Sequence, residues 1–318
     1  LKDQLKLRKA YHQYDHKKID LEKLKKVEEE TIRDIIKEQQ TAKLDIVTDG
    51  LIRWNDPVSY FMKRLEGVEI GGLLRFFDTN FYFRQPQIMG KLSLKEPCFK
   101  KDLLFLRAGT DADIKLVLTG PYTLALLSNI ATPHYQSVEE VSEALTELLV
   151  EEFKSIKEMG IPYIQIEEPG YLLTPPDWKW ASSLIKKLAA HQGNSKLILA
   201  TYFGDAAPYY SKLENLPVDI LGFDTTYSPG LLESLRKEGS RKEIQLGLLD
   251  GRNTKLESPD EVVGVLHSLE KTWRRLILTT SCGLEYLSRD RAFDKLNLLQ
   301  EIKYAYQGKN QTSKIKKG

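Results

Sequence analysis

The sequence is poor in cysteine, in long apolar runs and in excess charge of either sign, and each shortage excludes a class of protein. Only two cysteines, Cys98 and Cys282, occur among 318 residues, which argues against a disulfide scaffold and is typical of a reducing cytosol. No apolar run reaches the length of a membrane span, and no signal-peptide pattern opens the chain. The formal net charge is +2, from 47 basic and 45 acidic residues, so no overall field attracts nucleic acid or a membrane. We therefore expect a cytoplasmic protein without nucleic-acid or membrane partners.

Short apolar segments recur along the chain, and amphipathic segments of helical period separate them. Continuous apolar strands between amphipathic helices predict a parallel sheet that helices cover on the outside. The predicted strands are Leu44–Gly50, Asp113–Gly120, Tyr163–Pro169, Lys196–Phe203, Asp219–Thr226, Glu243–Gly251 and Arg275–Gly283.

Capping signals indicate where several helices begin. Asp20 and Ser258 are predicted N-caps, because a short polar side chain there can accept from the free N–H groups of the first turn. Asp56-Pro57 predicts the start of a helix that includes Leu65, with proline at its first position. Helices are predicted over residues 1–17, 21–42, 138–159, 178–191, 231–237, 259–273 and 289–306.

This alternation predicts an α/β fold, a (β/α)8 TIM barrel that forms one domain over residues 1–318. A closed barrel needs eight strands and only seven segments qualify, so we expect the first strand to precede the given sequence. An open doubly wound sheet is the alternative, but no predicted strand is followed by G-x-G-x-x-G or by a P-loop. Gly71-Gly72 and the aromatic run FFDTNFYFR predict an inserted β-hairpin over about residues 68–94, as a lid or a partner contact.

The segment Tyr163–Gly170 places two adjacent carboxylates at the end of a predicted strand. Successive side chains of a strand point to opposite faces, so Glu167 and Glu168 cannot both face one ligand. We expect one to face the inside of the sheet and the other to pack or cap outside. Barrel enzymes hold their chemistry at the carboxyl ends of the strands, although a solvated strand end is the alternative for any single strand.

Polar residues also end or follow the other predicted strands. In a parallel barrel these ends meet at one rim, so together they predict a site for a small polar ligand. Carboxylates there suit an ammonium group and arginines suit a carboxylate, which points to an amino-acid-like ligand. The candidates are Asp49, Arg53, Trp54, Asp56, Thr119, Tyr122, Glu167, Glu168, Tyr202, Asp224, Asp250, Arg252, Asn253, Ser281 and Cys282.

At these ends the sequence resembles the cobalamin-independent methionine synthases. The motifs that carry the resemblance are DIVTDGLIRWNDPVSYF, LVLTGPYTL, IQIEEP, VDILGFDTT, LGLLDGRNT and TSCGLEYLSRDRAFDKL, in the family's order. The resemblance implies a family of two related barrels. The C-terminal barrel carries a zinc ion that binds the homocysteine thiolate, and the N-terminal barrel helps to bind a polyglutamylated folate. TYFGD and LGLLDGRN resemble the N-terminal barrel, whereas the last motif resembles single-barrel archaeal and bacterial relatives.

The family's zinc ligands are incomplete in this sequence. The resemblance implies His-x-Cys on strand five, Glu on strand six and Cys on strand eight. Cys282 matches the last ligand and Asp224 stands at the glutamate position, but residues 197–203 contain neither His nor Cys. Two candidate ligands of four make a poor zinc site, so we expect no metal in this chain. Leu51 replaces a further family acid, whereas Glu167 matches the acid of the family's Asp-Glu-Pro motif.

The resemblance therefore implies methyl transfer from a 5-methyl-tetrahydropteroyl-type donor to homocysteine, with this chain as an N-terminal-type barrel and a zinc-bearing catalytic barrel as its partner. Glu167, Asp224 and Cys282 are the expected catalytic residues, and the other rim candidates are expected to bind substrate. Two alternatives remain open. One is a stand-alone methyltransferase that works without zinc, for example on a corrinoid-bound methyl group, and the other is a non-catalytic binding or scaffold barrel.

Overall fold

The computed structural model describes residues 2–228, 230–270 and 272–315, and its centre is a seven-stranded parallel sheet. Neighbouring strands follow one another in chain order, and all seven predicted segments take part. The strands are β1 (Ile46–Val47), β4 (Asp113–Thr119), β6 (Tyr163–Glu167), β7 (Lys196–Thr201), β8 (Ile220–Asp224), β9 (Glu243–Leu249) and β10 (Leu276–Thr280). This order has no reversal point, so the alternative of a doubly wound sheet is wrong.

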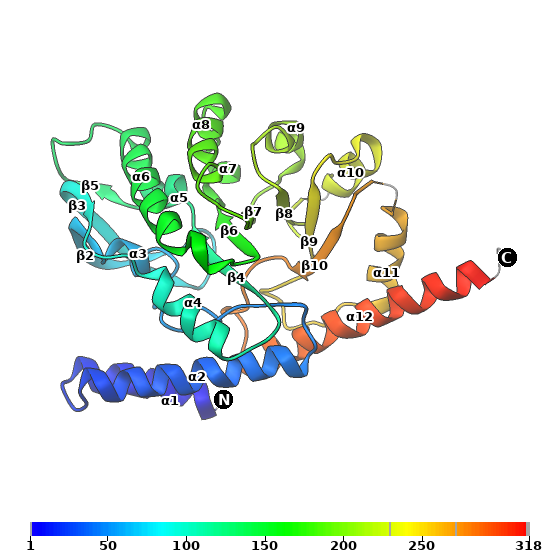
Figure 1. Cartoon of the computed structure of the whole chain (residues 1–318), viewed down its shortest axis with the longest axis horizontal. Coiled ribbons are helices and arrows are strands. Elements are labelled where there is room, and N and C mark those ends of the chain that lie inside the picture. The colour runs from blue at the N-terminus through cyan, green and yellow to red at the C-terminus, as the bar shows by residue number, and fades with distance from the viewer. Residues whose placement is uncertain (1, 229, 271, 316–318) are drawn as a thin grey trace.

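The sheet is curled as in a TIM barrel. Gln245 on β9 donates to Gln165 on β6 at 3.2 Å although β7 and β8 lie between these strands, so the bond crosses the inside of the curl. Below it, Tyr163, Ile198 and Ile220 from three strands form one buried apolar cluster. Helices lie round the outer side (Figure 1): α6 (Val138–Ile156), α8 (Trp178–Ala189), α9 (Tyr210–Glu214), α10 (Leu231–Glu238) and α11 (Pro259–Ser268).

A long helix lies next to each edge strand of the sheet along the chain. α2 (Leu21–Thr41) leads to β1, and α12 (Arg289–Ile315) follows β10. An ion pair of 2.8 Å joins Arg289 to Glu38, and one of 2.6 Å joins Lys303 to Asp45. Because these pairs connect the beginning of the barrel to its end, they hold β1 and β10, the edge strands of the described sheet, on the same side of the molecule.

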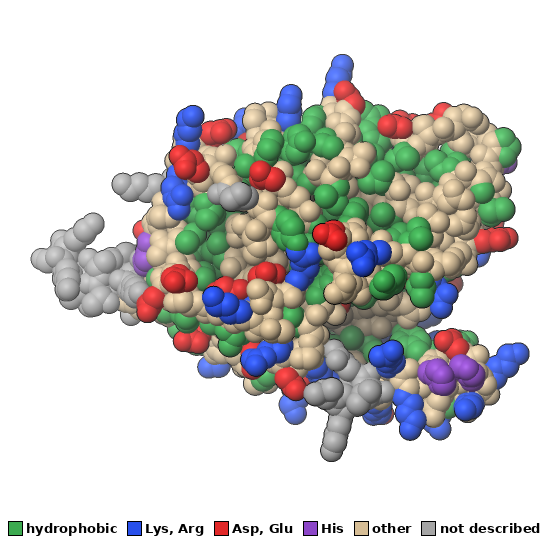
Figure 2. Space-filling model, turned by 180° about the vertical axis from the view of Figure 1, so that it is seen from behind, with side chains coloured by type: hydrophobic (Ala, Val, Ile, Leu, Met, Phe, Trp, Pro, Cys, Tyr) green, Lys and Arg blue, Asp and Glu red, His purple; other side chains and the backbone are tan. Residues whose placement is uncertain are grey.

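The N-terminal helices form an antiparallel pair below the sheet. α1 (Lys2–Asp15) packs on α2, which begins as expected at Asp20, whose carboxylate accepts from the Lys23 N–H at 2.8 Å. The end of this pair projects from the body, and lysine and histidine side chains gather there (Figure 2). His12, in the last turn of α1, and His16, just after it, are exposed. No helix of the described residues has the length and apolarity needed to span a membrane.

The predicted hairpin is confirmed and is longer than expected. β2 (Leu65–Arg75) pairs antiparallel with β3 (Tyr82–Leu94), and β5 (Asn129–Ile130) adds to β3. The helix predicted to include Leu65 is wrong in length, because α3 covers only Ser59–Met62. The reason is Asp56: it accepts from the N–H groups of Ser59 and, on β3, Arg84, and so ties the first turn of α3 to the hairpin.

The remaining elements connect strands to helices. The predicted helix that begins after Ser258 ends early, at Ser268, and α4 was not predicted. These connecting elements are α4 (Phe99–Ala108), α5 (Pro121–Leu126), α7 (Gly170–Leu173) and two short 3-10 turns, Lys157–Met159 and Ala207–Tyr209.

Candidate functional site

Glu167 ends β6 and lies at the mouth of the barrel. The Tyr202 hydroxyl donates to its Oε2 at 2.9 Å, and the Gln165 amide donates to its Oε1 at 2.8 Å. Burial raises the pKa of Glu167, while these two donors and the more distant Lys115 charge act in the opposite direction. The side chain is therefore a carboxyl group held in a fixed orientation at the carboxyl end of the sheet, where barrel enzymes carry their chemistry.

Glu168 points the other way, as strand alternation predicts. It is fully buried, and its two oxygens accept from the N–H groups of Tyr122 at 3.0 Å and Thr123 at 2.8 Å. These are free N–H groups at the start of α5, so Glu168 caps that helix. A Cβ on Gly120 would lie 2.2 Å from the same carboxylate, so the cap needs glycine there. The structure thus places Glu168 and Tyr122, both predicted to bind substrate, outside the mouth.

Asp224 and Cys282 come from β8 and from the loop after β10. Asp224 is buried and accepts from the N–H groups of Thr226 at 2.8 Å and Phe203 at 3.3 Å. Burial raises the pKa of Asp224 and raises the pKa of the Cys282 thiol well above its usual range. The negative charges of Glu285 and, less strongly, Asp224 also act on Cys282, so the sulfur is a neutral thiol.

The loop after β10 adds two mouth residues that are not among the candidates predicted from the sequence, Glu285 and Tyr286. Glu285 is exposed, and the charge of Glu167 acts on it. The pKa of Tyr286 is raised by burial and then by Glu285. Both follow Cys282 in the motif TSCGLEYLS, three and four residues after it. Their position two and three residues past Gly283, the predicted strand end, was the available signal.

Aromatic residues of the hairpin turn cover this mouth. Phe81 packs edge-on against Tyr286, with ring centroids 5.8 Å apart. Phe76 and Phe77 pack against Phe203, which follows β7, at 6.3 and 6.4 Å. The expected lid role of the hairpin therefore has contacts that support it.

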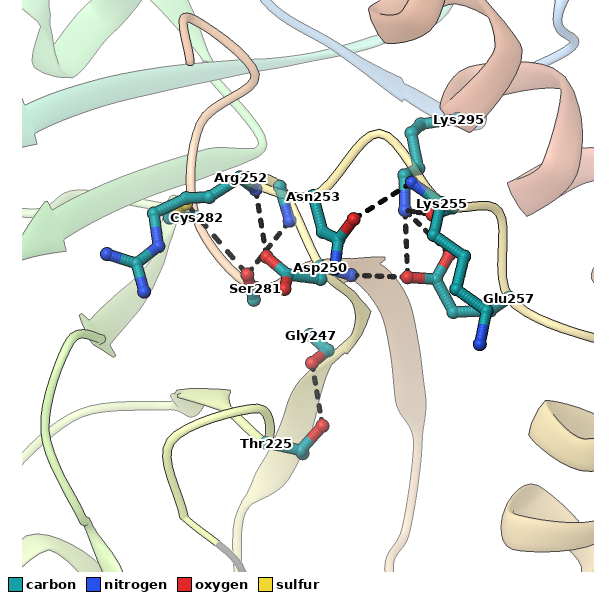
Figure 3. A network of polar contacts seen from close by, with 11 residues as sticks. Thr225, Gly247, Asp250, Arg252, Asn253, Lys255, Glu257, Ser281, Cys282 and Lys295 are labelled. Atoms are coloured by element: carbon teal, nitrogen blue, oxygen red, sulfur yellow. Dashed lines mark hydrogen bonds and ion pairs between the residues drawn. The ribbon is translucent and has the colours of Figure 1, made fainter. Parts of the chain in front are cut away.

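Arg252 belongs to the same aromatic group. Its guanidinium lies 4.9 Å from the ring centroid of Phe203 and 4.5 Å from that of Tyr227. Figure 3 shows this side chain extending away from Asp250, whose Oδ1 accepts from the Arg252 N–H at 2.9 Å. The Arg252 Nη1 also donates to the Asp78 carbonyl of the hairpin turn at 3.5 Å, and a guanidinium stacked on aromatic rings can present its remaining N–H groups to a carboxylate.

A buried ion pair fixes the loop that carries Arg252. Lys295 of α12 is fully buried, and its ammonium lies 2.8 Å from the Glu257 carboxylate, which also accepts from the Asp250 N–H (Figure 3). Asn253 and Ser281 accept from backbone N–H groups of the loop, each at 3.0 Å. Asp250, Asn253 and Ser281 therefore shape this loop.

The candidates after β1 form a separate group against α4. Arg53 pairs with Asp102 at 3.0 Å, and Trp54 stacks on Tyr60 with ring centroids 4.5 Å apart. Burial and the Asp102 charge raise the pKa of Asp49 to about 6. Among the described residues, no hydrogen bond or ring contact joins this group to the mouth. Thr119 likewise bonds inward, to the Pro57 carbonyl at 2.8 Å.

The mouth does not offer the donors of a zinc site. Among the residues that the structure describes, no three His, Cys, Asp or Glu side chains are grouped so that they could hold a metal. The end of β7 presents Thr201, Tyr202 and Phe203 where two ligands would be needed. Asp224 already accepts from two backbone N–H groups and β7 supplies no ligand, so the residues present do not fit a four-coordinate zinc ion.

Comparison with known proteins gives consistent matches along the chain. Residues 64–274 match the family model described as cobalamin-independent synthase, N-terminal domain. A methionine synthase of Saccharolobus solfataricus is 29% identical over 303 residues, 91% of this chain and 87% of that protein. One of Sulfurisphaera tokodaii is 28% identical over 300 residues, 91% and 85% respectively.

Solved structures share the fold at lower identity. A B12-independent methionine synthase from Shewanella sp. W3-18-1, solved in complex with selenomethionine, superposes with a TM-score of 0.77 at 23% identity, over 92% of this chain and 91% of that one. A putative vitamin-B12-independent methionine synthase from Listeria monocytogenes gives 0.68 at 18% identity, over 93% and 92%.

Proposed function

Because the chain belongs to the cobalamin-independent methionine synthase family, we propose that it takes part in methyl transfer from a 5-methyl-tetrahydropteroyl-type donor to homocysteine. It acts as an N-terminal-type barrel, and a second polypeptide supplies the zinc-bearing catalytic barrel. The family model that it matches is that of the N-terminal domain, which supports this division of labour.

One observation carries the proposal: Glu167 and Tyr202 lie hydrogen-bonded at the barrel mouth, next to Glu285 and under the aromatic turn. A carboxylate in this position suits the ammonium group of an amino acid, and the Arg252 guanidinium suits its carboxylate. The Shewanella protein of the same fold was solved with selenomethionine, a ligand with both groups, which supports an amino-acid site here.

The need for a partner follows from the chemistry of the thiol. The attacking species in methyl transfer is a thiolate, and a free thiol with a pKa near 8.5 is mostly protonated at neutral pH. The described residues provide no metal site that would lower that pKa. What this chain contributes is binding and orientation at Glu167, Asp224 and Cys282.

The test is reconstitution with the purified chain. We expect L-homocysteine to bind in calorimetry, and methyl transfer from 5-methyltetrahydropteroyltriglutamate to appear only when a zinc-bearing family protein from the same organism is added. Glu167→Gln is expected to abolish the homocysteine signal, and Lys196→Met, which changes a lysine at the opposite end of the sheet, is expected to keep it.

Other outcomes of this reconstitution would favour one of the two alternative functions. Turnover by the isolated chain after chelation would indicate a stand-alone methyltransferase, and the absence of both binding and turnover would indicate a scaffold barrel. Stoichiometric zinc in the isolated chain would overturn the ligand argument.

A further inference from the structure

The inside of the barrel beneath Glu167 is polar, which is unusual for this fold. TIM barrels fill their interior with branched apolar side chains in layers. Here the lower layer follows that rule, with Tyr163, Ile198 and Ile220. The layer between it and the mouth instead contains Lys115 from β4, Gln165 from β6 and Gln245 from β9.

These side chains form a directed chain of hydrogen bonds that ends at the mouth. Lys115 Nζ donates to Gln165 Oε1 at 2.7 Å, and Gln245 Nε2 donates to the same oxygen at 3.2 Å. Two donors on Oε1 turn the Gln165 amide so that its Nε2 donates to Glu167 Oε1 at 2.8 Å. Tyr202 holds the other carboxylate oxygen at 2.9 Å.

This arrangement does not serve stability alone. Gln165 and Gln245 are only 6% and 5% exposed, and the Gln245 Oε1 has no hydrogen-bond partner. A buried polar group without a partner costs about 1 to 3 kcal/mol, and apolar side chains of similar volume would avoid that cost. Glu167 gains from the layer, because it receives an oriented donor from Gln165 and the influence of the Lys115 positive charge.

We infer that Lys115 is a positioning residue: it acts through Gln165 to keep Glu167 ionised and oriented, so that the mouth accepts the ammonium group of an amino-acid substrate. The substrate part of this inference rests on the proposed function, whereas the effect on Glu167 does not. Lys115 touches no reacting atom, because it lies a full side chain below the mouth.

The charges around Glu167 set the pH range of this effect. Lys115 faces it from β4, Tyr202 from the end of β7, and Glu285 and Tyr286 from the loop after β10. Burial raises the pKa of Glu167, and the Lys115 charge lowers it. Burial lowers the pKa of Lys115 to about 8, so its positive charge is present at neutral pH and is lost above that value.

The first experiment measures Glu167 directly. The pKa is read from the carboxyl carbon by NMR in chain labelled with carbon-13 glutamate, with Glu167→Gln assigning the signal. Lys115→Met is expected to raise the pKa of Glu167 by about one unit. Lys115→Arg, which keeps the charge, and Lys196→Met, which removes a partly exposed lysine paired with Glu243, are expected to leave the pKa of Glu167 unchanged. An unchanged pKa in Lys115→Met overturns the inference.

A second experiment separates ionisation from packing. At pH 6, Lys115→Met is expected to bind L-homocysteine more weakly, because a larger fraction of Glu167 is then protonated, and to bind 4-sulfanylbutanoic acid, which lacks the ammonium group, equally well. Equal losses for both ligands would mean a packing role and overturn the inference.

If the unmodified chain binds neither ligand, the proposed function fails while the NMR result still decides the role of Lys115. If Lys115→Met does not fold, Gln165→Met removes the amide that joins Lys115 to Glu167 and is also expected to raise the pKa of Glu167.

Discussion

The ring of Phe81 meets the ring of Tyr286 edge-on, with 5.8 Å between their centroids. Phe81 lies in the turn of an inserted hairpin, and Tyr286 follows the last strand of the sheet. This contact joins the two segments over the mouth that contains Glu167 and Cys282. The hairpin is thus positioned as a lid, held by edge-on aromatic contacts that can separate without breaking a strand.

Removing one of these aromatic contacts is expected to expose Cys282. An aromatic pair contributes about 1 kcal/mol, so Phe81→Ala raises the population of open molecules about fivefold. The measurement is the rate of alkylation by iodoacetamide at each cysteine, resolved by mass spectrometry. Cys98 is buried to a similar degree and lies at the start of α4, so it serves as the internal control. Equal acceleration at both cysteines would indicate general loosening and contradict a lid.

The adjacent glutamates offer a matched pair of substitutions. Glu168→Gln places an amide N–H against the N–H groups of Tyr122 or Thr123, since both oxygens now accept from them, and is expected to lower the free energy of unfolding by about 1 to 3 kcal/mol. Glu167→Gln is expected to lower it by less than about 1 kcal/mol, yet to abolish homocysteine binding. Urea denaturation and calorimetry measure the two effects, and the reverse pattern would exchange the roles assigned to these neighbours.

The raised pKa of Asp49 predicts that the free energy of unfolding depends on pH. Burial and the Asp102 charge raise the pKa of Asp49 from 3.8 to about 6. A carboxyl group with a raised folded-state pKa contributes stability that is fully present below the unfolded value and is lost as pH rises through the folded value. Relative to Asp49→Asn, the unmodified chain is therefore expected to lose about 2 to 3 kcal/mol between pH 4 and pH 7.

Urea denaturation of both proteins across this pH range tests the Asp49 prediction. Taking the difference between the free energies of unfolding of the two proteins cancels the contributions of the other carboxyl groups. A difference that stays constant with pH, or that favours the unmodified chain at higher pH, would refute it.

The buried ion pair beside the Arg252 loop is expected to be costly to break. Lys295→Met leaves the Glu257 carboxylate without its cation and is expected to destabilise the fold by about 3 to 5 kcal/mol. The double variant Lys295→Met/Glu257→Gln is expected to recover part of this loss, because it leaves no unpaired charge. Chemical denaturation of the two single variants and the double variant measures the coupling, and simple additivity would show that the pair does not act as a unit.

Much of the fold could be predicted because its signals are local. The seven apolar segments became the seven strands, Asp20 and Ser258 cap their helices, and the alternation of Glu167 and Glu168 followed from the two-residue period of a strand. The helix predicted to include Leu65 was wrong because Asp56 bonds across to β3, and a contact with a distant strand leaves no trace in a local pattern.

The candidate site could be predicted only in part. The sequence placed the site at the strand ends, and the structure brings Glu167, Tyr202, Asp224, Arg252 and Cys282 into or beside one mouth. It places the residues after β1 against α4, and uses Glu168 as a cap. Proximity along a rim depends on how each loop folds after its strand, which strand positions alone do not specify.

By itself the sequence determined which segments are strands and helices, the order in which they pair, and which of two adjacent side chains faces inward, since periodicity, capping and short loops act between near neighbours in the chain. Only the tertiary structure decided that Lys115, Gln165 and Gln245 join beneath Glu167, and that Phe81 closes over Tyr286. Those contacts span dozens to hundreds of residues, and they exist because the sheet curls until strands that do not pair face one another across its interior.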